Sequence, residues 1–143
     1  MISYGPFQAE HFYDLHLQPA QRDIASFMTP HVLVKLERQR SNTIFDGAQP
    51  ILCGGVLENW SDSGLLWSFV GAGVSRSTML AVHRLTMAFI ESLTYTRLEM
   101  HVAVGFEAGH RWAKLLGFEC EAPCMKAFSQ GRDMALYARI RRG

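Results

Sequence analysis

The stretch EMHVAVGFEAGHRWAKLLGFECEA, residues 99–122, decides the fold. Its first part alternates apolar and polar residues, which is typical of a half-buried strand, and we expect a strand over residues 97–104. A short helix over residues 107–116 follows, and Gly117 is placed to end it in a left-handed conformation. Phe118 then begins another strand. A strand, a short helix and a strand in this order are typical of an α/β domain.

A long helix over residues 75–95 precedes this stretch. Its apolar positions recur at three- and four-residue spacing: Met79, Val82, Thr86, Phe89, Ile90 and Leu93. Ser75 is a suitable N-cap, because its hydroxyl can accept a free backbone N–H of the first turn. The helix lies between an apolar run over residues 64–71 and the strand over residues 97–104. A crossover of this kind predicts that the two strands are parallel.

The remaining pattern completes a mixed, mostly antiparallel sheet. Further strands are expected over residues 2–4, 43–46, 50–58, 118–122 and 134–140, and helices over residues 8–15 and 20–38. Pro30 should break or kink the second helix, so two shorter helices are an alternative. Asp62, Ser63 and Gly64 supply a turn between two strands. The sequence therefore predicts a single α/β domain over residues 1–143, with one parallel pair and flanking helices.

The composition fits a folded, water-soluble protein. The 143 residues are 48% hydrophobic and 19% charged, and the formal net charge is +1. Nothing in that balance points to nucleic acid, and the C-terminal cluster of Arg139, Arg141 and Arg142 is interpreted as a solubilising tail, with a phosphate or nucleic-acid contact as the alternative. No apolar run approaches the roughly 20 residues that a bilayer helix needs, and the first residues lack a secretion-signal pattern.

The three cysteines are interpreted as reduced thiols of a cytosolic protein. Cys53, Cys120 and Cys124 are an odd number and do not follow the spacing of a disulfide framework. Cys120 and Cys124 lack a histidine at the spacing of a zinc motif, so we expect no metal site.

Four stretches carry a resemblance to a known family: ILCGGVLENW (51–60), STMLAVHRLTMAFI (77–90), EMHVAVGFEAGHRWAKLLGFECEAP (99–123) and DMALYARI (133–140). Together they resemble the GNAT acetyltransferase fold, and more closely the small GNAT-like proteins encoded beside the structural genes of short-tailed bacteriophages. The resemblance implies an acyl-CoA between the fourth and fifth strands. It places the pantetheine arm on the backbone of the fourth strand and the pyrophosphate at the start of the following helix, where free N–H groups attract anions.

The resemblance assigns the pyrophosphate loop to SRSTMLA, residues 75–81. The cofactor-binding candidates are Arg76, Ser77, Thr78, Met79, Leu80 and Ala81. Arg76 matches the basic opening of the family's loop and Ala81 its small closing residue. Ser77 and Met79 stand near positions where the family has glycines, and their side chains would keep the backbone away from the phosphates. We therefore expect acetyl-CoA, the implied cofactor, to bind weakly if it binds.

The general acid that the resemblance implies is absent. Many family members have a tyrosine four residues before the Gly-Phe pair, where this chain has Ala113. Tyr137, His110 or Cys120 could replace it as proton donor. Tyr137 stands on an alternating strand, where a half-buried packing residue is the more usual interpretation.

Glu99 and His101 are the candidates for a general base. They share one face of a strand, roughly 6 to 7 Å apart. Such a pair could raise the pKa of the histidine and position a water, although both could also lie on a solvated face. Six aromatic residues could line a groove, but core packing is the more usual role: Trp60, Trp67, Phe69, Phe106, Trp112 and Phe118.

Two functions follow from the resemblance. The first is a non-catalytic phage protein that acts in the virion, in assembly or in DNA ejection, with other phage structural proteins as partners and the host cytoplasm or the virion as its location. The second is an active acetyl-CoA-dependent N-acyltransferase that modifies an amine on a host or phage protein. Ala113 and the missing glycines favour the first, but the fold alone cannot decide, because function belongs to the site.

Overall fold

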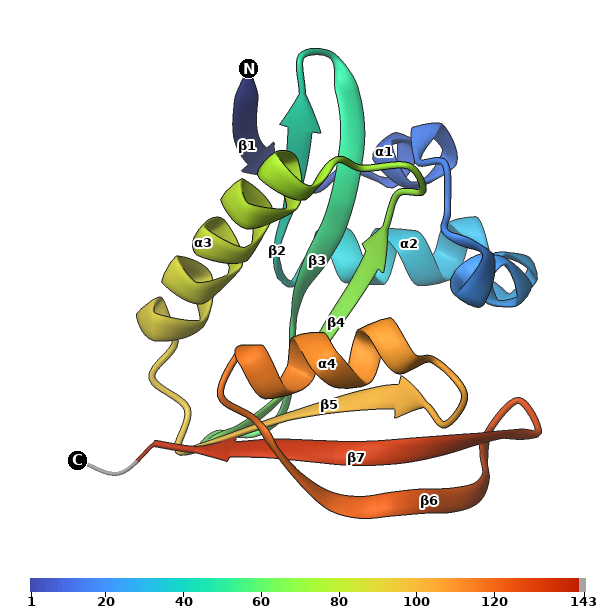
Figure 1. Ribbon diagram of the computed structural model, residues 1–143, viewed down its shortest axis with the longest axis vertical. Coiled ribbons are helices and arrows are strands. Elements are labelled where there is room, and N and C mark those ends of the chain that lie inside the picture. Colours follow the sequence, from blue (N-terminus) through green and yellow to red (C-terminus); the bar gives the residue numbers. More distant parts are fainter. Residues whose placement is uncertain (142–143) are drawn as a thin grey trace. The chain divides into compact units, whose positions relative to one another are not determined.

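The computed structural model describes residues 1–141 and forms an α/β fold with a mixed sheet (Figure 1). Its elements follow in this order: β1 (Ile2–Pro6), α1 (Ala9–Asp14), the 3₁₀ helix η1 (Pro19–Phe27), α2 (Pro30–Glu37), β2 (Arg40–Asp46), β3 (Gln49–Trp60), β4 (Ser63–Val70), α3 (Arg76–Ser92), β5 (Arg97–Ala103), α4 (Glu107–Leu115), β6 (Glu119–Ser129) and β7 (Arg132–Ile140).

The strands are hydrogen-bonded in the order β1-β2-β3-β4-β5-β7-β6. β4 and β5 are parallel, as the sequence predicts, and β7 lies between β5 and β6 and is antiparallel to both. The ladder between β4 and β5 covers only three residue pairs, from Ser63 beside Arg97 to Leu65 beside Glu99. β4 continues to Val70 beyond this ladder.

The chain divides into two compact units. The first contains Met1–Leu57 and Trp67–Ile90, and the second contains Glu58–Leu66 and Glu91–Gly143. Apolar side chains from helices and strands form one core cluster in the first unit: Phe7, Phe12, Leu15, Leu33, Leu36, Cys53 and Phe69. Buried side chains of the second unit include Leu98, Val102, Ala113, Leu116, Phe118 and Tyr137. The expectation of a single domain stays a prediction.

The predicted helix over residues 20–38 is two helices, which was the alternative. Pro30 occupies the first turn of α2, where its missing N–H removes no helical hydrogen bond. Thr29 caps this helix, because its Oγ1 accepts the N–H of Val32 at 3.4 Å. The preceding residues form the exposed 3₁₀ helix η1 rather than an α-helix.

Several strands extend further than periodicity indicated. β2 begins at Arg40, β3 ends at Trp60, and Ser63 belongs to β4 rather than to the turn. β6 is the largest correction, because it continues to Ser129 instead of ending at residue 122. Its pairing with β7 shifts register three times. Each shift interrupts the two-residue alternation by which a strand is recognised in a sequence.

In the second unit, α4 packs on one face of β5. Gly109 permits the close approach, since a Cβ atom there would lie 2.7 Å from the Phe106 ring and 2.8 Å from Val102. Gly117 has a φ of +89°, so the predicted left-handed helix end is confirmed. The predicted N-cap of α3 is also confirmed, although this helix ends at Ser92 rather than at residue 95.

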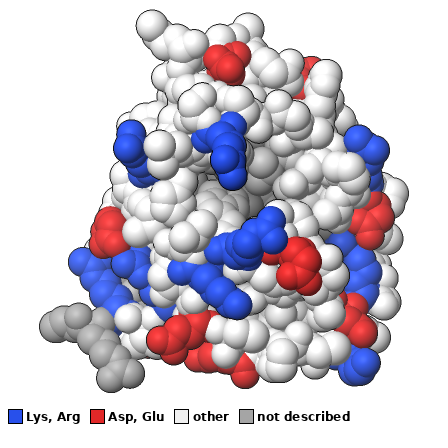
Figure 2. Space-filling model, in the orientation of Figure 1, with Lys and Arg blue, Asp and Glu red and all other residues white. Residues whose placement is uncertain are grey.

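Charged side chains of both signs are interspersed over the face drawn in Figure 2. Two of the C-terminal arginines are engaged, because Arg139 pairs with Glu91 at 2.5 Å and Arg141 donates to the carbonyl of Leu93. Arg142 lies outside the described residues. No helix within residues 1–141 is long and apolar enough to cross a bilayer.

Candidate functional site

The start of α3 in the first unit is only partly open to an anion. Ser75 Oγ accepts the N–H of Thr78 at 3.2 Å, and Ser75 O accepts that of Met79 at 2.9 Å. No hydrogen bond to the N–H groups of Arg76 and Ser77 is found within residues 1–141. The exposed Arg76 side chain also forms no ion pair there. These groups could meet a phosphate, although side-chain hydroxyls now stand where a glycine-rich loop would leave the backbone bare.

The other cofactor element implied by the resemblance is the open edge of β4. Backbone groups of a strand point alternately to its two neighbours. The N–H of Gly71 donates to Ile51 of β3 at 2.8 Å, so the groups of Ser68 and Val70 point away from β3. The carbonyl of Asp62 points to the same edge of the chain, where it accepts the backbone N–H of Arg97 at 3.1 Å.

A segment from the N-terminal part of the chain already covers this edge. The Gln21 amide bonds β4 twice: its Nε2 donates to the Ser68 carbonyl at 2.9 Å, and its Oε1 accepts the Val70 N–H at 2.9 Å. The N–H of Gln18 donates to the Val70 carbonyl at 3.1 Å. Leu17 forms an antiparallel bridge with Gly71 just beyond. The protein itself therefore bonds the carbonyl of Ser68 and both backbone groups of Val70, and this covered part of β4 does not fit a pantetheine arm.

The position of the expected general acid is a packed core position. Ala113 has no exposed surface, and its carbonyl accepts the N–H of Phe118 at 3.0 Å. A larger side chain here would have to displace its neighbours. The tertiary environment of Ala113 is thus adapted to a methyl group.

Tyr137, a proposed substitute for that acid, is bonded to His110. The tyrosine hydroxyl lies 2.7 Å from His110 Nδ1, while His110 Nε2 lies 3.1 and 2.9 Å from the carbonyls of Ala103 and Val104. Carbonyls only accept, so Nε2 carries a proton, and in the corresponding neutral tautomer Nδ1 accepts the tyrosine hydroxyl. Burial raises the pKa of Tyr137, and the residue is 3% exposed. It is fully buried rather than half-buried as predicted.

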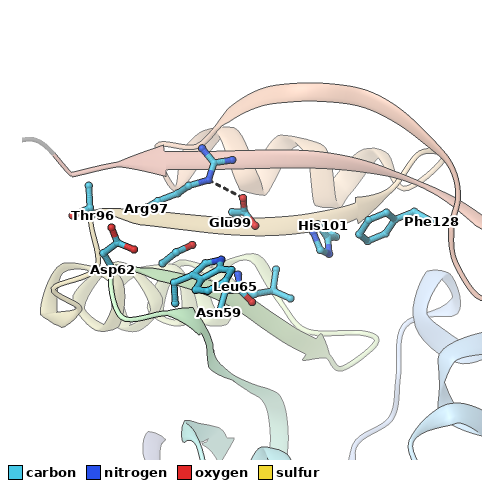
Figure 3. A pocket seen from close by; sticks show the side chains of 10 residues that line it. Asn59, Asp62, Leu65, Thr96, Arg97, Glu99, His101 and Phe128 are labelled. Atoms are coloured by element: carbon cyan, nitrogen blue, oxygen red, sulfur yellow. Dashed lines mark hydrogen bonds and ion pairs between the residues drawn. The ribbon is translucent and has the colours of Figure 1, made fainter.

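Glu99 and His101 line a hollow of about 700 Å³ in the second unit (Figure 3). Ser63 and Leu65 of β4, and Arg97 of β5, also line it. The neighbouring Met100 lies beside Tyr137 in the ladder with β7 and belongs to the opposite face of β5. The structure therefore brings Glu99 and His101 together and places Tyr137 on the other face of the sheet.

Arg97 holds the carboxylate of Glu99. Its Nε donates to Glu99 Oε2 at 2.7 Å, and its two terminal nitrogens bond the carboxylate oxygens of Glu121 at 3.1 and 2.6 Å. The alternation that pairs Glu99 with His101 in the sequence also places Arg97 on their face, so the sequence contained this signal. One carboxylate oxygen of Glu99 is therefore engaged by the guanidinium.

His101 keeps a neutral ring near neutral pH. Burial lowers its pKa, and the charge of Glu99 opposes this shift without overcoming it. The hypothesis that Glu99 raises the pKa of His101 is therefore wrong in its net direction, because burial of the ring outweighs the charge of Glu99. The ring of His101 packs edge-on against Phe128, with 4.7 Å between ring centroids. A neutral imidazole in a hollow can accept a proton.

The aromatic residues divide between core and surface. Phe69 and Phe118 are buried, as core packing predicts, whereas Trp60 is 75% exposed and lines the hollow. No group of three or more potential metal ligands lies within residues 1–141, and the expectation of no metal stays a prediction.

Solved structures with the same fold match the chain along its whole length. Ard1 from Thermoplasma volcanium superposes with a TM-score of 0.78 at 12% identity, covering 99% of both chains. An N-acetyltransferase from Staphylococcus aureus Mu50 gives 0.73 at 11% identity, covering 98% of this chain and 97% of its own. A GNAT family acetyltransferase from Bacillus cereus gives 0.67 at 10% identity, covering 100% and 99%.

This chain therefore has the fold of the GNAT acetyltransferases. No protein-family model matches the sequence, and no curated protein does either. Identities this low establish the fold alone, so the function has to be argued from the residues.

Proposed function

We propose that the chain is a GNAT-fold protein that does not catalyse acyl transfer and acts through contacts with other proteins. The observation that carries this proposal is the closed edge of β4. Gln21 and Gln18 bond the carbonyl of Ser68 and both backbone groups of Val70, which the pantetheine arm of acetyl-CoA would need. A ligand would have to break these bonds before it could form its own.

The proton chemistry supports the same conclusion. Ala113 is packed where the resemblance implies an acid, and the hydroxyl of Tyr137 is buried and bonded to His110. A positioned proton donor contributes about 10²- to 10⁴-fold to a rate. A site that lacks it would release an unprotonated thiolate.

The biological setting rests on the sequence resemblance. Four stretches resemble small GNAT-like proteins of short-tailed bacteriophages, so we propose a virion, assembly or ejection component with other phage structural proteins as partners. The host cytoplasm during infection and the virion are the proposed locations.

Calorimetric titration with acetyl-CoA tests the central claim. We expect no saturable binding by the wild type up to about 1 mM, the upper end of ordinary KM values. Gln21→Ala should bind more tightly because it frees the Ser68 and Val70 groups, whereas Gln39→Ala, at an exposed glutamine, should behave like the wild type. Acetyl-CoA turnover in a thiol-release assay that disappears in Arg76→Ala would overturn the proposal.

An active N-acyltransferase is the second candidate, and one observation favours it. His101 lines an open hollow beside Glu99, and its lowered pKa keeps the ring able to accept a proton from an amine. Two of the solved structures named above are described as acetyltransferases, which are proteins that use acetyl-CoA. If this candidate is correct, thiol release with an amine acceptor is measurable and is lost in His101→Gln.

A further inference from the structure

The hollow in the second unit has a floor formed by one face of a two-stranded parallel ladder. Ser63 lies beside Arg97 and Leu65 lies beside Glu99, and His101 continues the row on β5. Paired strands are separated by about 4.8 Å, so these side chains form a continuous surface. All of them belong to the first residues of β4 and to β5, rather than to the end of β4 that Gln21 covers.

The charge of this surface is negative. Arg97 is the only cationic side chain among the residues that line the hollow, and all three of its nitrogens are bonded to carboxylates. Glu99 and Glu121 together carry one charge more than Arg97 neutralises. Asp62 lines the hollow as well, and its carboxylate has no hydrogen bond or ion pair within residues 1–141. The N–H groups of Arg97 already bond carboxylates, so an anion would find no charged partner in the hollow. A cation would find two, the carboxylates of Glu99 and Asp62.

A serine hydroxyl without a protein partner also lines this hollow. Ser63 lines the hollow, is only 9% exposed, and forms no side-chain hydrogen bond within the described residues. An unbonded hydroxyl in the wall of a hollow can donate to a ligand atom or accept a hydrogen bond from it. Glu99 also has an unbonded oxygen, because Arg97 bonds only its Oε2. Ser63 and Glu99 thus offer two acceptors on adjacent strands.

Aromatic side chains complete the lining. Trp60 is 75% exposed and Phe128 is 47% exposed, and both line the hollow. Figure 3 shows Phe128 beside His101 at one end, while Asp62 and Thr96 lie at the other. Exposed indole and phenyl rings attract cations through their π faces, and a guanidinium also stacks on them.

We propose that this hollow binds an arginine side chain presented by a basic segment of a partner protein. The planar guanidinium can bond the free oxygen of Glu99 and the hydroxyl of Ser63 while it lies against Trp60. A polypeptide is the occupant that fits, because the hollow is open and its exposed aromatic rings would remain uncovered around a small amine. The proposal names a partner chemistry for the function proposed above and needs no CoA.

Binding of capped peptides, followed by NMR on the isotope-labelled protein, tests the proposal. We expect acetyl-Gly-Arg-Gly-amide to shift the amide signals of residues 62–65 and 97–101 in a saturable way. The Lys counterpart should bind at least about threefold more weakly, and free agmatine should bind more weakly than the Arg peptide. Equal binding of the Lys peptide would overturn the guanidinium assignment, and equal binding of agmatine would overturn the protein-segment assignment.

Substitutions of residues that line the hollow test whether the Arg peptide binds there. Trp60→Ala and Asp62→Asn, both at exposed positions, should each weaken binding of the Arg peptide about threefold or more. Tyr4→Ala, at an exposed aromatic residue of the first unit, and Glu10→Gln, at an exposed carboxylate of α1, should leave it unchanged. Wild-type affinity in both hollow variants would refute the proposal. This outcome is independent of the acetyl-CoA titration, because no cofactor is present.

Discussion

The pKa of His101 is set by the surroundings of its ring. The sequence places Glu99 two residues away, and an isolated carboxylate at that distance would stabilise the charged imidazole. Glu99, which also pairs with Arg97 at 2.7 Å, does act in this direction on the ring. Burial of the ring is the larger effect, so the pKa of His101 falls.

This shift predicts that stability decreases in mild acid. The unfolded chain binds a proton at His101 near the ordinary pKa of 6.5, while the folded protein resists it, so the free energy of unfolding falls as the pH drops below that value. The thermal midpoint of the wild type should fall more between about pH 7.5 and pH 5.5 than that of His101→Gln. His31→Gln, at an exposed histidine, should keep the wild-type pH dependence. Parallel wild-type and His101→Gln curves would contradict the assignment.

β4 shows how one element's edge can decide what a fold binds. An uncovered strand edge is free to pair with another chain or a ligand, and proteins commonly protect such edges. Here the Gln21 side chain imitates a strand by giving β4 one donor and one acceptor. The Leu17 bridge extends this cover to Gly71. A GNAT fold can therefore keep its topology while the edge that its cofactor would need is occupied.

The end of α4 provides a test of backbone conformation. Gly117 has a φ of +89°, and a Cβ atom there would lie no closer than 3.6 Å to Arg139, so space is available but the conformation is unfavourable. Gly117→Val should lower the free energy of unfolding by about 1 kcal/mol or more, because a β-branched residue is strained there. Gly117→Asn should lose less, since asparagine tolerates this conformation. Urea denaturation of both variants measures the difference, and equal losses would contradict the explanation.

In the folded chain as a whole, the three cysteine thiols differ in their exposure to solvent. Cys53 is buried in the core of the first unit, and burial raises the pKa of its thiol to about 12, although the Thr43 hydroxyl opposes the shift. Cys120 and Cys124 are exposed on β6. Because the thiolate is the reactive form, an alkylating reagent should modify two thiols rapidly in the native protein and the third only after unfolding.

Mass spectrometry of the alkylated protein counts the modified thiols. Cys53→Ala should remove the slow thiol and leave the two fast ones unchanged. Three fast thiols in the native wild type would show that Cys53 is accessible and that the core is packed differently.

The sequence by itself determined the features that depend on neighbouring residues. The period of the apolar residues placed α3 and β5, Ser75 marked the start of a helix, and Gly117 marked the end of another. These signals are local, because they depend on backbone conformation and on side chains within one turn or two strand positions. The parallel pairing of β4 and β5 followed from the crossover helix between them. The alternation along β5 also placed Glu99 and His101 on one face, which the hollow confirms.

Only the tertiary structure decided how the site residues are used. Gln21 bonds Ser68, which lies 47 residues away, and Tyr137 bonds His110 across 27 residues. Arg97 joins Glu121 on a strand whose irregular register concealed its length. No periodicity or cap encodes such contacts, because they arise when strands pair and helices pack on them. The physical reason is that a hydrogen bond between distant segments depends on the register of every element between them.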